Sequence, residues 1–451
     1  MQFEITNEFI QEISELIALN KSDAVSELLQ DLHPADIAEV LDEFSFDEAV
    51  FVMRLLNSET TSDILEELEE DTRARVLEQL SPKEIAQEID ELETDAAADI
   101  IAELPEERKD RVIAHLDDKE HAKDIVDLMR YDEDSAGGLM GKELVRVNEN
   151  WTIMHCVKEM RRQAQEIGEV YIVYVVDDND NLIGRLSLKS LLTTSTRTIV
   201  KDVYVGDIHS VKTTDHADDV AQIMQKYDLF VIPVVDQMGR LVGNITIDDV
   251  VDHIRDEADK DYQMAAGLTD DVEADDSIYE LVKGRLPWLI LGLLGGLGSV
   301  FILEGFETVM TNPKYRALFF FTPLIAAMAG NVGVQSSAIV VQGLANNIIK
   351  GSIWKRLMKE VGLTLISGFV LAIMIIIFGY FMSYTLDFSL TIAISLIAVI
   401  IIAALVGTFV PIVLDKRGID PALATGPFIT TSNDIFGIFI FFYIAKLLLG
   451  F

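Results

Sequence analysis

Five long apolar stretches dominate the last third of the chain. Each is long enough to cross a bilayer as a single helix, because about 20 apolar residues span the hydrocarbon core. The sequence therefore predicts a transmembrane domain at residues 285–451 built from five helices. These helices are expected at roughly 286–303, 317–342, 361–384, 390–414 and 427–449.

From residue 1 to about 130 the apolar positions recur at helical spacing, and a short unit repeats. HPADIAEVLDEF (33–44), SPKEIAQEIDEL (81–92) and ETDAAADIIAEL (93–104) each begin with a cap-like residue and carry a similar apolar stripe. Ser81 and Glu84 match a capping box. The pattern predicts an all-α N-terminal domain at 1–130, wound as a helical superstructure.

The periodicity changes near residue 137, where a duplicated unit begins. VYIVYVVDDNDNLIGRLSLKSLL (170–192) matches LFVIPVVDQMGRLVGNITIDDVV (229–251) at an offset of 59 residues. Each copy reads as helix, buried strand, turn, strand and helix. This duplication resembles a tandem pair of CBS domains, so we expect two α+β domains at 131–200 and 201–256.

CBS pairs often bind adenine nucleotides through a Ser or Thr and an acid three residues later. The second copy has this pair as Thr246 and Asp249, whereas the first has Ser187 followed by Ser190 at the acid position. The resemblance therefore implies ATP as a possible ligand at Thr246. A purely structural, dimerising module is the alternative, and the residues leave both open.

The segment 252–285 joins the duplicated unit to the first apolar stretch. It is acidic and contains no proline. We expect a stiff connecting helix at 257–284 that could transmit movement to the membrane.

Charge divides the chain at nearly the same point. Residues 1–282 hold 68 acidic and 25 basic residues, whereas residues 283–451 hold 7 and 11. A domain this acidic repels nucleic acid and anionic lipid and attracts divalent cations. The alternative explanation is that the acidic residues form a solvated surface without a specific role. The single Cys156 excludes a disulfide or cysteine cluster. Scattered histidines and the lack of a P-loop, an HExxH or a nucleophile–base motif argue against an enzyme.

Basic residues flank the apolar stretches unevenly and predict the orientation. They lie before the first stretch, between the second and third, and between the fourth and fifth: Lys283, Arg285, Lys350, Lys355, Arg356, Lys359, Lys416 and Arg417. By the positive-inside rule the N-terminus is cytoplasmic and the C-terminus extracellular, although Lys314 and Arg316 fall on the outer side. We expect a multi-pass protein of the plasma membrane.

Polar residues at membrane depth are costly and so mark function. Asp434 is the acid of the fifth stretch, and no basic residue lies within one turn of it. A bound cation explains it better than a protonated or helix-capping aspartate does. Asn331 and Gln335, in AGNVGVQSSA (329–338), place amides in the second stretch, where packing of small residues is the alternative explanation. Together these residues predict a polar pore lining.

One carboxylate per protomer suits a hydrated ion better than a full protein cage. In a twofold dimer, two copies of Asp434 would face each other across the axis. Mg²⁺ dehydrates reluctantly and is often held by one or two carboxylates with its waters retained. Ca²⁺ favours more direct oxygen ligands, and Zn²⁺ favours His or Cys. The residues therefore favour Mg²⁺.

The whole pattern resembles the MgtE family of magnesium channels. The most specific segments are GNVGVQSSA, DPALATGP, SND (432–434) and AGGLM (136–140). The resemblance implies a homodimer with its pore on the twofold axis, lined by Asp434 and Asn331 and gated by cytoplasmic Mg²⁺. It implies sensor ligands at Asp63, Asp95, Asp99, Asp249, Asp252, Glu257 and Asp261, with Lys260 where relatives can have an acid.

Charge suggests how such a sensor would work. Two copies of residues 1–282 carry about −86, so their acidic surfaces repel one another unless cations bridge them. Bound Mg²⁺ would hold the parts together and the pore shut, and its loss would open the pore. Two rival hypotheses are a nucleotide-sensing transporter of another solute and a membrane-anchored divalent buffer without a pore.

Overall fold

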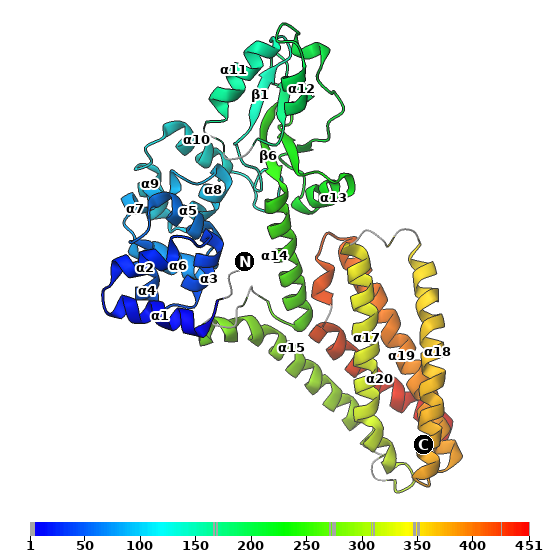
Figure 1. The fold of residues 1–451 in the computed structure, drawn as a ribbon. Helices are drawn as coiled ribbons and strands as arrows, with labels where there is room; N and C mark the ends of the chain where they lie inside the picture. Colours follow the sequence, from blue (N-terminus) through cyan, green and yellow to red (C-terminus); the bar gives the residue numbers. More distant parts are fainter. Residues whose placement is uncertain are drawn as a thin grey trace. The chain divides into compact units, whose positions relative to one another are not determined.

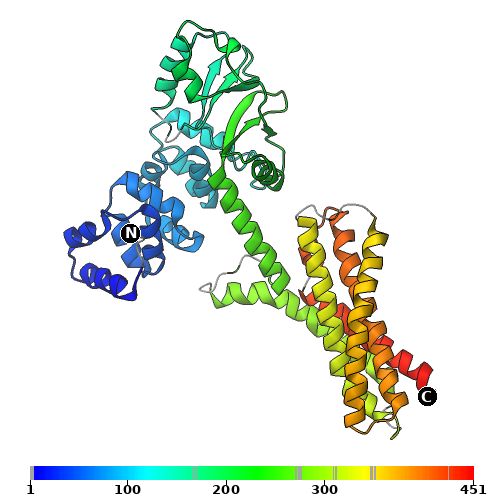
Figure 2. The same cartoon turned by 45° about the vertical axis from the view of Figure 1, so that its right-hand side comes forward.

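The computed structural model describes residues 5–165, 167, 170–269, 272, 277–307, 309, 312–345, 349, 352–424 and 426–450. The chain divides into two compact units, Met1–Ile254 and Arg255–Phe451, and each is described by itself (Figures 1 and 2). Lys350, one of the basic residues behind the predicted orientation, lies outside the described residues.

The first unit begins with a stack of short helices, drawn blue to cyan in Figure 1. Most pack on the helix two further along the chain, such as α3 on α5, α5 on α7 and α7 on α9. This confirms the predicted helical superstructure. The bounds are α1 Asn7–Ala18, α2 Ser22–Leu29, α3 Pro34–Asp42, α4 Phe46–Met53, α5 Ser58–Glu67, α6 Glu70–Gln79, α7 Pro82–Ile89, α8 Thr94–Glu103, α9 Glu106–Ile113 and α10 Lys119–Leu128.

The same local rules start several of these helices. Ser81 and Glu84 form the predicted capping box at α7, with Pro82 in the first turn. Ser45 and Glu48 form another capping box at α4. Each such box satisfies backbone N–H groups that have no partner within the helix.

Two matching three-stranded sheets follow the helical stack. In the sheets β1-β2-β3 and β4-β5-β6 the first pair of strands is parallel and the second antiparallel. This repetition confirms the predicted tandem α+β pair. The strands are β1 Val145–Asn148, β2 Val173–Val176, β3 Leu182–Leu186, β4 Val211–Lys212, β5 Val231–Val235 and β6 Leu241–Thr246, and the helices are α11 Ile153–Gln163, α12 Leu188–Thr193, η1 Val200–Asp202, α13 Ala217–Tyr227 and α14 Ile247–Ala266.

The helical stack shares one hydrophobic core with the second α+β copy. Buried residues of α8 such as Ile101 belong to the same cluster as Ile232 of β5 and Val250 of α14. The first copy has a separate core around Val173 and Val175. Because each fully buried Leu, Ile or Val contributes about 1.5–3 kcal/mol, the shared core fixes α8 beside the start of α14.

The second unit contains five helices long and apolar enough to cross a membrane among its described residues, which confirms the five predicted spans. Helix α19 lies at its centre and packs on α17, α18 and α20. Gly407 of α19 approaches the Gly333 carbonyl of α17 so closely that an added Cβ would lie 2.3 Å from it. The bounds are α15 Ile278–Gly305, η2 Arg316–Phe321, α17 Thr322–Ala345, α18 Ile353–Phe381, α19 Leu386–Asp415, η3 Pro421–Ala424 and α20 Gly426–Leu449.

The prediction of one uninterrupted connecting helix at 257–284 is wrong. Helix α14 ends at Ala266, and Gly267 follows it in the left-handed region of backbone conformation, with a φ of +85°. A new helix, α15, begins at Ile278 behind a capping box of Ser277 and Glu280. A left-handed glycine and a capping box are stop and start signals that the absence of proline does not override.

Candidate metal centres

An acidic cluster lies where the helical stack meets the α+β pair. Ligand atoms of Glu93, Asp95 and Glu143 all lie within 4.8 Å of one another. Glu143 is held in place by Thr94, whose backbone N–H and Oγ1 donate to its carboxylate at 3.0 and 2.9 Å. An added Cβ at Gly141 would lie 2.8 Å from Asp95 Oδ2, so glycine allows the chain to pass this close.

Asp249 extends this cluster from the start of α14. Its Oδ2 accepts hydrogen bonds from the Thr246 backbone N–H at 3.0 Å and from Thr246 Oγ1 at 2.5 Å. Burial, then Asp249, then Glu143 raise the pKa of Asp95 well above its ordinary value. Burial likewise raises the pKa of Asp249, although the Thr246 bonds oppose the shift. The carboxylates of Asp95 and Asp249 therefore repel each other across the junction.

Two further carboxylates respond to the same concentration of charge. Partial desolvation, then Glu67, Glu93 and Asp249 raise the pKa of Glu66 to about 7. Desolvation and then Glu133 raise the pKa of Asp99 to about 7, against the attraction of Arg73. Both side chains stay open to solvent, so a cation can reach them.

The basic groups nearest this cluster already have partners. Arg73 binds Glu103 at 2.6 Å, and the Lys142 ammonium binds Asp127 at 2.9 Å. Carboxylates held this close to one another favour taking up protons or binding a cation. The arrangement is therefore chemically suited to a divalent ion with oxygen ligands.

The structure brings together only some of the predicted sensor ligands. Asp95 and Asp99 each interact electrostatically with Asp249. Asp252 acts on Asp249, and Asp63 acts on Glu66. Glu257 and Asp261 lie further along α14, in the second unit, where Lys260 donates to Glu257 at 3.3 Å. The sequence analysis missed Glu66, Glu93 and Glu143, because in so acidic a domain no local signal separates them from surface acids.

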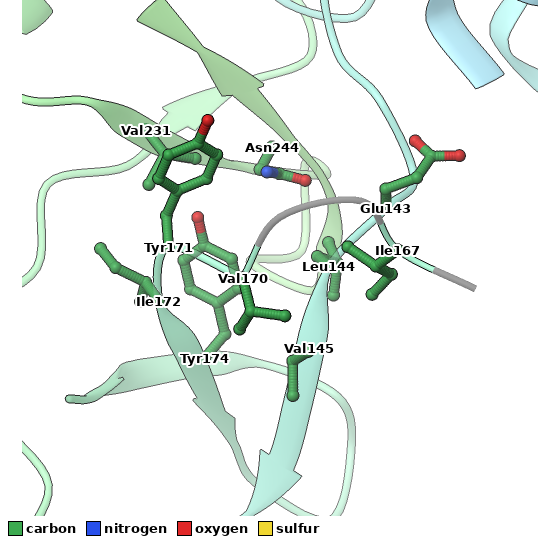
Figure 3. A pocket seen from close by; sticks show the side chains of 10 residues that line it. All are labelled: Glu143, Leu144, Val145, Ile167, Val170, Tyr171, Ile172, Tyr174, Val231 and Asn244. Carbon is green, nitrogen blue, oxygen red and sulfur yellow. The ribbon is translucent and has the colours of Figure 1, made fainter. Parts of the chain in front are cut away.

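The cleft between the two α+β copies is small in this structure. It measures about 10 Å³, room for one water. Figure 3 shows Tyr171, Tyr174 and Asn244 among the side chains that line it. Thr246, the predicted nucleotide contact, is not among the lining residues and instead caps α14 with Asp249.

A polar cavity of about 400 Å³ lies in the membrane unit between α17 and α20. Asp434 is the carboxylate in its lining. The cavity is lined by Ala326, Ala327, Gly330, Asn331, Val334, Gln335, Thr430 and Asp434. The structure thus brings Asn331 and Asp434 to one cavity.

Small residues let the two helices of the cavity approach each other. An added Cβ at Gly330 would lie 3.2 Å from Thr430 Cγ2 and 3.8 Å from Asp434 Oδ1. An added Cβ at Gly333 would lie 1.8 Å from the Asn433 amide nitrogen. A larger residue at Gly333 would therefore displace the Asn433 side chain or push α20 away from α17.

Fold and sites together define a multi-pass membrane transport protein with an acidic domain joined to a CBS pair. Family models match as divalent cation transporter at 322–444, MgtE intracellular N domain at 32–134, and CBS domain at 136–196 and 200–256. The chain belongs to the MgtE family of divalent cation transporters. It is therefore a transporter and not an enzyme, as the sequence predicts.

Named relatives share most of the chain. The magnesium transporter MgtE of Thermus thermophilus is 35% identical over 325 residues, 71% of this chain and 72% of the relative. The magnesium transporter MgtE of Enterococcus faecalis is 34% identical over 71% and 70% of the two chains. A solved structure, the cytosolic domain of the Mg²⁺ channel MgtE in complex with ATP, is 33% identical with a TM-score of 0.51, covering 54% of this chain and 99% of that one.

Proposed function

We propose that this protein is a Mg²⁺-selective channel for magnesium influx. Mg²⁺ bound among its acidic cytoplasmic domains closes the channel, and a fall in internal Mg²⁺ opens it. The observation that carries the proposal is the cavity of about 400 Å³ whose lining includes Asp434 and the amides of Asn331 and Gln335. The relatives named as magnesium transporters support the choice of ion.

The size of the cavity suits an ion that keeps its water. Six waters at about 30 Å³ each occupy roughly 180 Å³, so a hydrated Mg²⁺ fits without losing its shell. Carboxylate and amide oxygens can then bind the waters of the ion. Such contacts stabilise the ion weakly enough for it to leave again, which conduction requires.

The exposed side of the cavity supports a homodimer. Asn331 and Gln335 are exposed in the single chain, while Asp434 is half-buried. Amides and a carboxylate do not face lipid tails, so this stripe should face water or a second copy of the chain. A twofold axis beside α17 and α20 would place a second copy of the chain and a water-filled pore next to this stripe, with two copies of Asp434 around the pore.

The acidic cluster is the proposed sensor. A divalent ion among Asp95, Asp249 and Glu143 would replace their mutual repulsion with attraction to a shared ion. The ion would bind the assembled state preferentially and shift the gate toward closure. The predicted orientation, with the N-terminus in the cytoplasm and the C-terminus outside, would expose this cluster to internal Mg²⁺.

ATP is a second proposed ligand, because a 33% identical cytosolic domain is known in complex with ATP. The cleft of about 10 Å³ would have to widen to admit a nucleotide. The alternative function, a nucleotide-sensing transporter of another solute, predicts gating by ATP with no dependence on Mg²⁺.

Patch-clamp recording of the reconstituted protein tests the proposal. With Mg²⁺ as the charge carrier, internal Mg²⁺ is raised from near zero to about ten millimolar, the free concentration that should saturate weak carboxylate sites. Unitary currents silenced by internal Mg²⁺ are expected. Vesicle uptake without unitary current would mean a carrier, and no uptake would favour the alternative function.

A further inference from the structure

Helix α18 buries a carboxylate that the pore and sensor leave unexplained. Glu360 is only 8% exposed and lies within the third apolar helix. The Oγ of Ser336 on α17 donates to Glu360 Oε1 at 2.6 Å. Ser336 itself is 3% exposed, so this bond is shielded from water. A hydrogen bond to a carboxylate in such surroundings is strong and costly to break.

Helix α17 presents two different faces. Asn331 and Gln335, one turn apart, line the cavity. Ser336 follows Gln335 directly and therefore points about 100° away around the helix. Gly333 lies against Asn433 of α20 and Gly407 of α19. The contacts on the side of α17 away from the cavity therefore determine which of its residues face the cavity.

Glycine contacts permit close approach but do not fix the rotation of a helix. A side-chain hydrogen bond has direction, so it fixes both distance and rotation. Compared with the glycine contacts of α17, the hydrogen bond between Ser336 and Glu360 is directional. Glu360 is not among the residues that line the cavity, so it acts on the pore only through α17.

We infer that Glu360 is a positioning residue for ion conduction: through Ser336 it fixes the rotation of α17 that keeps Asn331 and Gln335 in the cavity opposite Asp434. The inference rests on the proposed channel function. What matters at residue 360 is a hydrogen-bond acceptor, so glutamine should replace glutamate there and alanine should not.

Single-channel recording of the full-length protein tests this with Ser336→Ala, Glu360→Ala and Glu360→Gln. We expect the first two to lower unitary Mg²⁺ conductance and the preference for Mg²⁺ over Ca²⁺ several-fold and equally. The double alanine variant should be no worse than either one. Glu360→Gln should behave like the wild type, and closure by internal Mg²⁺ should stay unchanged in all of them.

Thr364→Val is the matched control. Thr364 lies one turn further along α18, is 2% exposed, and its Oγ1 has no hydrogen-bond partner among the described residues. Its replacement should leave conductance unchanged. If Ser336→Ala keeps wild-type conductance and selectivity, the inference is wrong. If Glu360→Gln is as damaging as Glu360→Ala while Ser336→Ala is harmless, the charge of Glu360 acts on the ion directly and the inference is again wrong.

A labelling experiment reads the rotation of α17 without any current. Gln335→Cys should react with a water-soluble thiol reagent in the otherwise wild-type chain and react several-fold more slowly when combined with Ser336→Ala. The native Cys156 is buried, and burial raises the pKa of its thiol to about 11, so it should stay silent. Equal labelling of both chains would overturn the inference even if the protein proves not to be a channel.

Discussion

The two candidate centres of this protein use carboxylates in opposite ways. The first unit places Glu66, Asp95 and Asp99 each within electrostatic reach of Asp249. The membrane cavity has Asp434 as the carboxylate in its lining. A shared cluster spreads binding over many groups, whereas a solitary carboxylate carries it alone. Single substitutions should therefore weaken the first centre by degrees and abolish the second.

The sharpest test of this contrast is Asp434→Ala. Without its carboxylate the cavity keeps only neutral groups, and an electrostatic contact worth a few kcal/mol per ion corresponds to a hundredfold or more. We expect Mg²⁺ conductance to fall by at least about a hundredfold in patch-clamp recordings of the reconstituted protein.

Asp387→Ala is the control, because Asp387 is an exposed acid in the first turn of α19. It should conduct normally. Protection of the first unit by Mg²⁺ against proteolysis should be unchanged in both variants. Normal Mg²⁺ currents through Asp434→Ala would remove the cavity as the ion pathway.

The sensor should respond more gently to Asp95→Asn or Asp249→Asn. Each change removes one negative charge from the acidic cluster, which keeps its other carboxylates. Closure should therefore need about tenfold more internal Mg²⁺, which corresponds to a loss of about 1.4 kcal/mol in binding free energy. Unitary conductance should not change. The measurement is the open probability against internal Mg²⁺.

Glu39→Gln on α3 serves as the control, because Glu39 is an exposed acid that is not one of the carboxylates of the cluster. Its Mg²⁺ dependence should match the wild type. If Asp95→Asn alone abolished closure, Mg²⁺ binding would depend on one carboxylate and not on several. The contrast between the two centres would then be wrong.

The same contrast explains what the sequence could predict. Asp434 stands out as an acid in an apolar stretch, and the structure places it in the lining of one cavity with Asn331. The five spans and the duplicated sheets were predictable because hydrophobic length and repetition are local signals. Glu360 was not, because it directly follows basic residues at the start of α18 and its burial depends on contact with α17.

The acidic cluster of the first unit was predictable only in part, for the same reason. Asp95 and Asp249 came from a resemblance, while Glu143 needed the fold to bring it to Thr94, 49 positions away. The end of α14 at Ala266 could not be predicted from a lack of proline, because Gly267 ends the helix. A left-handed glycine ends a helix just as firmly.

Protons should compete with Mg²⁺ for the acidic cluster of the first unit. Glu66 and Asp99, with pKa values near 7, must lose protons before they can bind Mg²⁺. Lowering internal pH from about 8 to about 6 should therefore raise the Mg²⁺ needed for closure several-fold. Recording at both pH values checks this, and Asp99→Asn should flatten the dependence.

Stability gives the same pH effect an independent readout. Both pKa values lie above those of ordinary carboxyls, so ionisation destabilises the folded, metal-free unit, and this loss develops as pH rises toward and through 7. Without Mg²⁺, hydrogen exchange of the first unit should be faster at pH 8 than at pH 6 after correction for intrinsic rates. Mg²⁺ should reverse the order, and a pH-independent result in both conditions would contradict the assignment.

The smallest expected effect concerns the backbone beside the cluster. An added methyl group at Gly141 would lie 2.8 Å from Asp95 Oδ2 and 2.9 Å from Glu143 Oε2, too close for either carboxylate to stay in place. Because both are ends of side chains that can move by a few tenths of an ångström, Gly141→Ala should raise the Mg²⁺ needed for closure only about two- to threefold, within the range of small packing changes. Gly206→Ala is the matched control, since an added Cβ there meets nothing closer than 3.5 Å. Equal Mg²⁺ dependence in the two alanine variants would mean that the spacing of Asp95 and Glu143 does not set the affinity, and would move the sensor toward Asp99 and Glu66.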